Sequence, residues 1–239
     1  MTSEKKAAKM PVEFTQEEKN IVSYVMDNKL TLVSYERLWA TLMACKHAVE
    51  RDIPGDFVEC GVWRGGNAIL AAAIFKLYGS DRRVYLFDTF KGMTEPTEAD
   101  KYFSDGSSVR EVFLSKQRDT HNEMYYSALE EVKANFAKAN LLDENVIIVE
   151  GDVLVTLEQE QNLPDKIAVL RLDTDWYEST KKELEILYPR VSIGGSLIID
   201  DYGHFTGSKK ATDDYFEETK KRPLLLYTDY TGRIGVKYD

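Results

Sequence analysis

Two short apolar runs, Val169 to Leu172 and Leu197 to Ile199, each end abruptly in two nearby aspartates. Apolar runs of this length that are bounded by polar residues are typical of buried strands. The run K-K-E-L-E-I-L-Y-P-R between them is helical in character. A helical crossover makes two strands parallel, so both end at the same edge of one sheet. The sequence therefore predicts an α/β fold in which four carboxylates converge where open sheets bind ligands.

The four carboxylates are Asp173 and Asp175 after the first run, and Asp200 and Asp201 after the second. Like charges this close raise one another's pKa unless a cation lies among them. Ligands that are all oxygen favour a hard ion, Mg²⁺ before Ca²⁺ or Mn²⁺. Any one of these aspartates is as readily a solvated or helix-capping residue. An Asp-Asp pair beside an Asp-x-Asp pair, however, favours a metal site.

The length, composition and net charge of the chain limit the class of protein. A chain of 239 residues with 43% apolar residues can form one large domain, 1–239, and the even spread of elements favours one. The net charge of −10 argues against nucleic acid and an anionic membrane as partners. No apolar run approaches the about 20 residues that span a bilayer, and residues 1–12 lack the apolar core of a signal peptide. Cys45 and Cys60 indicate buried, reduced thiols, so we expect a cytoplasmic protein.

The rest of the chain alternates strands with helices. Residues 1–12 are expected to be a flexible tail and 14–51 an N-terminal helical cap or oligomer contact, in a protein that forms a homo-oligomer, a dimer or higher. This order predicts a doubly wound, mostly parallel, Rossmann-like sheet that carries one antiparallel strand and ends in an antiparallel hairpin. The expected elements are helices 14–26, 35–50, 65–78 and 122–139, strands 56–62, 83–87 and 146–149, and the hairpin strands 224–227 and 234–237.

The interval 91–121 fits none of these elements. It is long, polar and rich in turn residues, with isolated aromatic side chains at Tyr102, Phe103 and Phe113. A loop of this length in a compact domain is usually a lid or is disordered. We expect it to be a lid over the substrate.

The first strand-to-helix turn, F-V-E-C-G-V-W-R-G-G, places Glu59 two residues before Gly61. Glycines there let the backbone approach a ligand closely. The spacing G-x-x-x-G-G differs from the dinucleotide fingerprint, and the preceding acid argues against pyrophosphate. Asp88 ends the next strand, where an acid can bind both hydroxyls of a ribose. Together these features fit a nucleoside with a positive charge and no phosphate, and S-adenosylmethionine has that description.

Four separated motifs make the chain resemble the macrocin O-methyltransferase family (TylF/MycF-like), from about Tyr35 to the C-terminus. They are D-F-V-E-C-G-V-W-R-G-G, F-D-T-F-K-G-M, R-L-D-T-D-W-Y-E-S-T and I-I-D-D-Y-G-H-F. Members of this family are Mg²⁺- and S-adenosylmethionine-dependent enzymes that methylate sugar hydroxyls on antibiotics and related glycosides. The resemblance implies the class I methyltransferase fold and an acceptor that carries a sugar, but it does not identify the acceptor.

The resemblance also implies roles for single residues. Metal binding would fall to Asp173, Asp200 and Asp201, with Asp175 near the acceptor. Candidate cofactor contacts are Glu59, Gly61, Trp63, Arg64 and Gly65 in the first motif, Asp88 and Thr89 in the second, Asp152 beside the adenine, and Tyr35 at the start of the second helix.

Methyl transfer is an in-line displacement at a sulfonium carbon, so the leaving group needs no acid. The sugar hydroxyl is almost un-ionised at pH 7, and a divalent ion that contacts it lowers its pKa. A carboxylate within hydrogen-bond reach can then take the proton. We expect Asp175 to be this base, because one of two acids two residues apart can bind metal while the other stays free. Asp173 and Asp175 could exchange these roles, and His204 is a second candidate base.

Three other interpretations each account for part of the sequence. Asp173-x-Asp175 also matches the metal motif of nucleotide-sugar glycosyltransferases, which leaves Glu59 and the glycine turn without a role. Aspartyl-nucleophile phosphatases share an Asp-x-Asp after an apolar strand, but there the motif opens the sheet and Tyr177 would be Thr or Val. A non-catalytic nucleoside-binding protein would explain the glycine turn and not the acids.

Overall fold

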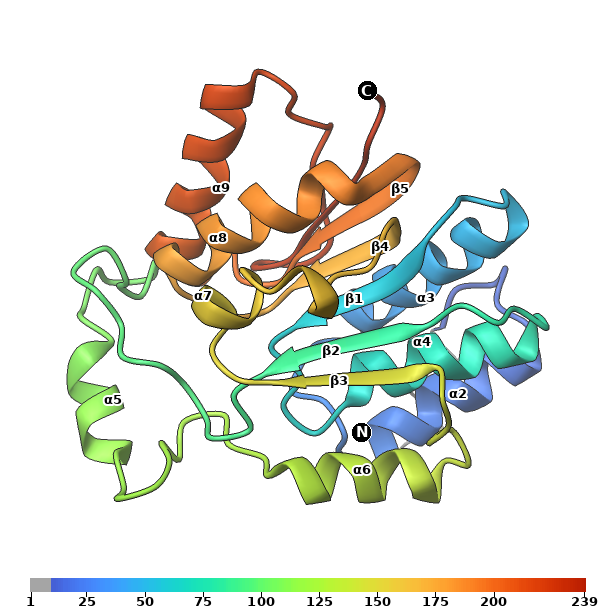
Figure 1. Ribbon diagram of the computed structural model, residues 1–239, viewed down its shortest axis with the longest axis horizontal. Helices are drawn as coiled ribbons and strands as arrows, with labels where there is room; N and C mark the ends of the chain where they lie inside the picture. The colour runs from blue at the N-terminus through green and yellow to red at the C-terminus, as the bar shows by residue number, and fades with distance from the viewer. Residues whose placement is uncertain (1–9) are drawn as a thin grey trace.

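The protein, described here by a computed structural model over residues 10–239, is built on one seven-stranded sheet (Figure 1). The strand order is β3-β2-β1-β4-β5-β7-β6. Strands β1 to β5 pair in parallel, and β7 runs antiparallel to both of its neighbours. The predicted doubly wound sheet with one antiparallel strand is confirmed. The strands are β1 Asp56–Cys60, β2 Val84–Asp88, β3 Val146–Glu150, β4 Ile167–Leu172, β5 Val191–Ile199, β6 Leu226–Tyr227 and β7 Arg233–Val236.

Helices cover both faces of the sheet (Figure 1). One face packs against α2, α3, α4 and α6, and the other against α7, α8 and α9. Successive residues of β1 feed the two cores, with Phe57 in the first and Val58 in the second, because side chains alternate along a strand. The helices are α2 Gln16–Asp27, α3 Tyr35–Glu50, α4 Gly66–Leu77, α5 Arg110–Lys116, α6 Leu129–Lys138, α7 Val153–Thr156, α8 Tyr177–Leu187 and α9 Thr206–Thr219, with 3₁₀ turns η1 Glu160–Asn162 and η2 Tyr188–Arg190.

The N-terminal helices begin where their capping residues predict. Thr15 accepts a hydrogen bond from the Glu18 backbone N–H, and the Glu18 carboxylate accepts one from the Thr15 N–H at 2.7 Å. Ser34 caps α3 in the same way by accepting from Arg37 N–H. Such caps satisfy backbone donors that the first helical turn leaves free. None of the helices in residues 10–239 is long and apolar enough to cross a membrane.

Several elements differ from the sequence prediction. The helix predicted over 122–139 begins only at Leu129, because the Asn122 side chain accepts from Met124 N–H and donates to the Phe113 carbonyl, which competes with helix formation. Strand β5 begins at Val191, not at 197, since the Gly194-Gly195 pair forms part of an irregular strand rather than a turn. Helix α9 was not predicted.

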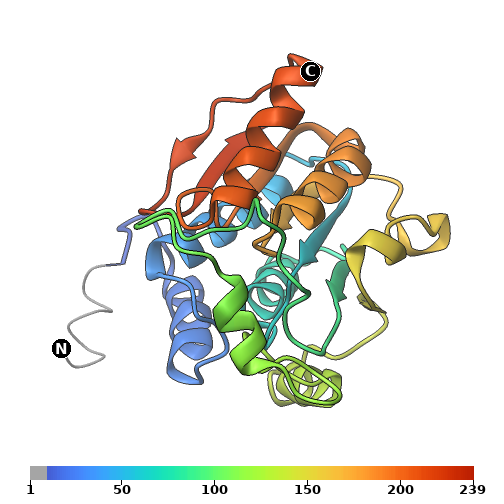
Figure 2. The ribbon, with the colours of Figure 1, turned by 90° about the vertical axis from the view of Figure 1, so that its left-hand side faces the viewer.

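The segment 91–121 is packed against the domain and contains α5. Trp176 Nε1 donates to the Thr94 carbonyl at 2.9 Å, and Phe103 N–H donates to the His204 carbonyl at 2.8 Å. The Tyr102 and Phe205 rings lie 5.4 Å apart. Figure 2 looks toward the edge at which the parallel strands end, and this segment, in green, crosses that side. The position of segment 91–121 favours a role as a lid, and this role stays a prediction.

Candidate active site

A cavity of about 250 Å³ lies at the carboxyl ends of the parallel strands. It unites motifs that are far apart in the sequence, since the glycine turn, the end of β2 and both aspartate pairs open into it. Such a position, at the switch point between β1 and β4, is where open α/β sheets bind ligands. The predicted site residues that line it are Glu59, Gly61, Trp63, Asp88, Thr89, Asp152, Asp173, Asp175, Asp200, Asp201 and His204.

Three predicted cofactor residues do not line this cavity. Arg64 donates to the Glu131 carboxylate at 2.8 Å and to the Lys29 carbonyl at 2.9 Å. Gly65 is the N-cap of α4, and the Tyr35 ring packs 6.0 Å from that of Trp39. Their proposed cofactor contacts stay predictions, and the structure gives Arg64 and Gly65 roles in shaping the turn.

Gly61 joins the cofactor half of the cavity to the acidic half. Its φ of 83° lies in the left-handed region, and a Cβ there would sit 2.0 Å from the Asp173 carbonyl oxygen. Asp173 N–H in turn donates to the Cys60 carbonyl at 2.8 Å. Only glycine allows the turn after β1 to pass this close to the end of β4.

Asp88 holds the glycine turn from the neighbouring strand. Its carboxylate accepts from the backbone N–H groups of Val62 at 2.7 Å, Trp63 at 3.2 Å and Phe90 at 2.7 Å. Burial raises the pKa of Asp88, and these hydrogen bonds oppose the rise. Asp152, on the next strand end, accepts from Leu154 N–H and caps α7. Both predicted cofactor acids therefore also fix the backbone around the cavity.

Carboxylate oxygens of Asp173, Asp175 and Asp201 all lie within 4.8 Å of one another. Asp175 is 6% exposed and Asp201 7%. One oxygen of Asp201 is buried without a hydrogen-bond partner among residues 10–239. Burial, followed by the neighbouring charges, raises the pKa of Asp201 well above its usual value, and burial does the same for Asp173 and Asp175. Three crowded carboxylates with an unsatisfied oxygen can hold a cation.

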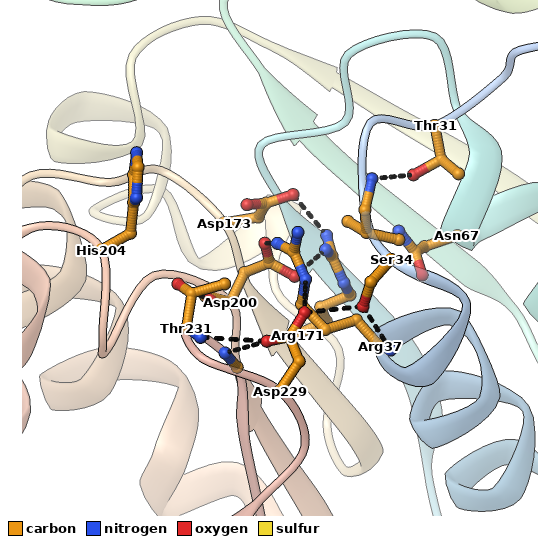
Figure 3. Close-up of polar contacts among 12 residues, drawn as sticks. Thr31, Ser34, Arg37, Asn67, Arg171, Asp173, Asp200, His204, Asp229 and Thr231 are labelled. Atoms are coloured by element: carbon orange, nitrogen blue, oxygen red, sulfur yellow. Dashed lines mark hydrogen bonds and ion pairs between the residues drawn. The ribbon is translucent and has the colours of Figure 1, made fainter.

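Asp200 is engaged differently from its neighbour Asp201. One of its oxygens pairs with the Arg171 guanidinium and the other with Arg37, which also binds Asp229 at 3.0 Å. Figure 3 shows the two guanidinium groups converging on Asp200. The metal set Asp173, Asp200 and Asp201 stays a prediction. The structure groups Asp173 and Asp201 with Asp175, whereas both oxygens of Asp200 are paired with guanidinium groups.

Arg171 is a buried residue of the site that the sequence did not lead us to expect there. It is 1% exposed and pairs with Glu59 at 2.7 Å and Asp173 at 2.6 Å, as well as with Asp200. Burial raises the pKa of Glu59 to about 7, against the opposing effect of Arg171. The signal was present, because an arginine inside the apolar run A-V-L-R-L needs buried acids as partners.

The loop that carries Asp173 and Asp175 is held from α8. Thr174 Oγ1 donates to the Glu183 carboxylate at 2.8 Å and lies 2.9 Å from Ser179 Oγ. Asp175 has a φ of 69°, a conformation that costs free energy in a residue with a side chain. The buried Glu183 therefore stabilises the turn that aims Asp175 into the cavity.

His204 lies apart from the arginine–carboxylate network (Figure 3). Its Nδ1 is 3.3 Å from the Tyr230 hydroxyl, and its ring contacts Tyr102 and Phe205. Burial and then the charge of Arg37 lower its pKa, so the imidazole is neutral at pH 7 and able to accept a proton.

A sequence profile of the macrocin-O-methyltransferase (TylF) family matches residues 2–234. The chain belongs to this family. It is 41% identical over 187 residues to the 8-demethyl-8-(2,3-dimethoxy-alpha-L-rhamnosyl)-tetracenomycin-C 4'-O-methyltransferase of Streptomyces olivaceus. The aligned region covers 77% of this chain and 67% of that protein. It is 38% identical over 206 residues to the demethyldecarbamoylnovobiocin O-methyltransferase of Streptomyces niveus, with 86% and 74% covered.

Solved structures agree with the TylF assignment. The O-methyltransferase NovP superimposes with a TM-score of 0.77 at 34% identity, over 87% of this chain and 82% of NovP. An O-methyltransferase from Bacillus cereus, solved in complex with SAH, superimposes with a TM-score of 0.57 at 14% identity, which shows a common fold. This TylF-family protein is therefore an O-methyltransferase with the fold of the class I S-adenosylmethionine-dependent enzymes.

Proposed function

We propose that this enzyme transfers the methyl group of S-adenosylmethionine to a hydroxyl of a sugar in a glycosylated small molecule, with Mg²⁺ at the acidic cluster. The observation that carries the proposal is that the glycine turn and the three-carboxylate cluster line one cavity. The Streptomyces relatives support the acceptor class, since one is named for a rhamnosyl-tetracenomycin and the other for demethyldecarbamoylnovobiocin.

The cofactor half suits a cationic nucleoside. Asp88 and Asp152 lie at the ends of β2 and β3, where they can bind the ribose and adenine. The turn at Gly61 lets the backbone approach the methionine portion closely. The acids that line the cavity attract the sulfonium charge.

The acidic half suits a hard divalent ion. Its donors are oxygens, its carboxylates are crowded, and Asp201 offers a buried oxygen with no partner among the described residues. Asp173 and Asp201 would hold the ion, with Asp175 beside both. Bound there, a divalent ion lowers the pKa of a hydroxyl that contacts it.

Asp175 takes the proton of the acceptor hydroxyl in this proposal. Burial makes its carboxylate more basic than a solvated aspartate, so it accepts a proton more readily at neutral pH. Its turn is fixed by Thr174 and Glu183, which keeps the carboxylate in position. His204, neutral and on the same cavity, is the alternative base.

The test uses binding and product analysis. Calorimetry should show that S-adenosylmethionine binds and that UDP-glucose does not, which separates a methyltransferase from a glycosyltransferase. The protein is then incubated with S-adenosylmethionine, Mg²⁺ and a panel that contains demethyldecarbamoylnovobiocin and phenyl α-L-rhamnoside. Mass spectrometry should find one added methyl group on the sugar. Methylation confined to the aglycone, or no binding of S-adenosylmethionine, would contradict the proposal.

A further inference from the structure

Tyr125 has an unusual backbone conformation at the wall of the cavity. Its φ is 52°, in the left-handed region that residues with a side chain rarely adopt. The flanking backbone imposes this conformation, because Asn122 N–H donates to the Lys91 carbonyl at 2.8 Å and Met93 N–H to the Met124 carbonyl at 3.2 Å. Strain of this kind is found where a residue's position serves a ligand.

The Tyr125 side chain lines the cavity and stays 40% exposed. The side chain ends in a phenol hydroxyl, and Asp175 and Asp201 line the same cavity. None of the hydrogen bonds within residues 10–239 involves this hydroxyl. By contrast, the hydroxyls of Tyr177 and Tyr202 donate to aspartates.

The neighbouring Tyr126 shows what an ordinary tyrosine does in this segment. It is similarly exposed, at 38%, but its ring stacks on His121 with centroids 4.3 Å apart, and it does not line the cavity. Its backbone is not strained. Of the two adjacent tyrosines, only Tyr125 has the left-handed backbone and lines the cavity that Asp175 also lines.

We propose that Tyr125 is an acceptor-binding residue, whose ring lies against the sugar ring and whose hydroxyl hydrogen-bonds to a hydroxyl of that sugar beside Asp175. An aromatic ring offers a flat apolar face and a polar tip, which match the C–H face and the hydroxyl edge of a pyranose. The same side chain keeps water from the acids once the acceptor is bound. The inference rests on the proposed function, because it needs a sugar acceptor.

The experiment measures acceptor binding without turnover. Demethyldecarbamoylnovobiocin, or the panel glycoside that the wild-type enzyme methylates fastest, is titrated into the enzyme saturated with S-adenosylhomocysteine and Mg²⁺. We expect Tyr125→Ala to raise the acceptor Kd about 10- to 100-fold and Tyr125→Phe about 3- to 10-fold. Tyr126→Ala, the matched control, should leave the acceptor Kd unchanged. The Kd of S-adenosylmethionine should be unchanged in all three variants.

Stability separates a ligand contact from a packing residue. Tyr125→Gly removes the strain, so its Tm should equal the wild-type value or exceed it by up to about 4 °C, while acceptor binding is lost. Wild-type acceptor affinity in Tyr125→Ala or in Tyr125→Gly would overturn the role of Tyr125 alone. Failure of the wild-type enzyme to bind any glycoside would overturn the proposed function, and this inference with it.

Discussion

Arg171 on β4 and Glu59 on the adjacent β1 form an ion pair of 2.7 Å in which each side chain is only 1% exposed. The same guanidinium reaches Asp173 and Asp200, so one buried cation compensates acids from both halves of the cavity. A buried ion pair adds little net stability, but removing one partner leaves the other charged and without compensation.

Replacing Arg171 with Met should therefore lower the free energy of unfolding by about 3–5 kcal/mol, measured by urea denaturation. The control is Lys133→Met, which breaks an exposed pair with Glu130 on α6 and should cost less than about 1 kcal/mol. A loss of similar size in both variants would mean that Arg171 does not compensate the buried acids.

Asp88→Ala should weaken S-adenosylmethionine binding by about 10- to 100-fold, because the carboxylate fixes the glycine turn and, in the proposed function, would bind the ribose. Calorimetry gives this ratio directly. Asp81→Ala removes the same charge at an exposed position before β2 and should bind as the wild type does. Wild-type affinity in Asp88→Ala would remove this residue from the cofactor site.

Glu183 should make stability depend on pH. Burial raises its pKa from 4.5 to about 8, so the folded state holds a proton that the unfolded state has lost. This contribution to stability is fully present below pH 4.5 and disappears as the pH rises through 8. Relative to Glu183→Gln, wild-type unfolding free energy should fall by roughly 4 kcal/mol between pH 5 and pH 9. Parallel curves for the two proteins would show that Glu183 is ionised throughout.

Gly207→Ala should release the segment 91–121 from the domain. A Cβ at this position would lie 1.8 Å from Asp100 Oδ1, which accepts from Tyr177 N–H at 2.8 Å. Limited proteolysis within the segment should become faster, while cofactor plus acceptor should slow it in the wild type. Gly79→Ala, which meets no atom within 4 Å, is the control. An unchanged digestion pattern would mean that Asp100 does not anchor this segment.

The sequence predicted the sheet because β1 to β5 each contain an apolar run of strand length, and it predicted the N-terminal helices from Thr15 and Ser34. It did not predict α9, whose sequence T-G-S-K-K-A-T-D-D-Y-F-E-E-T is mostly polar. That helix forms by packing against α8, with Phe216 buried in the core beside it, and such tertiary contacts leave little trace in local periodicity.

The sequence predicted which acids gather at the site, but it did not predict which partners each acid contacts. Asp200 and Asp201 are adjacent in sequence, yet successive side chains at a strand end point to opposite sides. Asp200 therefore pairs with two guanidinium groups, whereas Asp201 lies in the cluster with Asp175. This difference depends on where the fold places Arg37 and Arg171. Tyr125 was assigned to a helix that in fact begins four residues later.

Magnesium dependence separates the roles of the acids. Asp201→Asn should need more Mg²⁺ for half-maximal rate and recover part of its rate in excess Mg²⁺, because a ligand is lost. Asp175→Asn should respond to the same Mg²⁺ concentration as the wild type but lose about 10²–10⁴ in maximal rate, with a residual rate that rises with pH as hydroxide replaces the base. Rescue of Asp175→Asn by Mg²⁺ would make Asp175 a ligand and favour His204 as the base.

The most direct test is the rate of methyl transfer from labelled S-adenosylmethionine to the best glycoside of the panel, as Mg²⁺ is titrated into EDTA-treated wild-type enzyme. We expect a negligible rate in EDTA and a saturable rise with Mg²⁺, since the ion would lower the pKa of the acceptor hydroxyl. A full rate in EDTA would contradict a role for Mg²⁺ in the reaction.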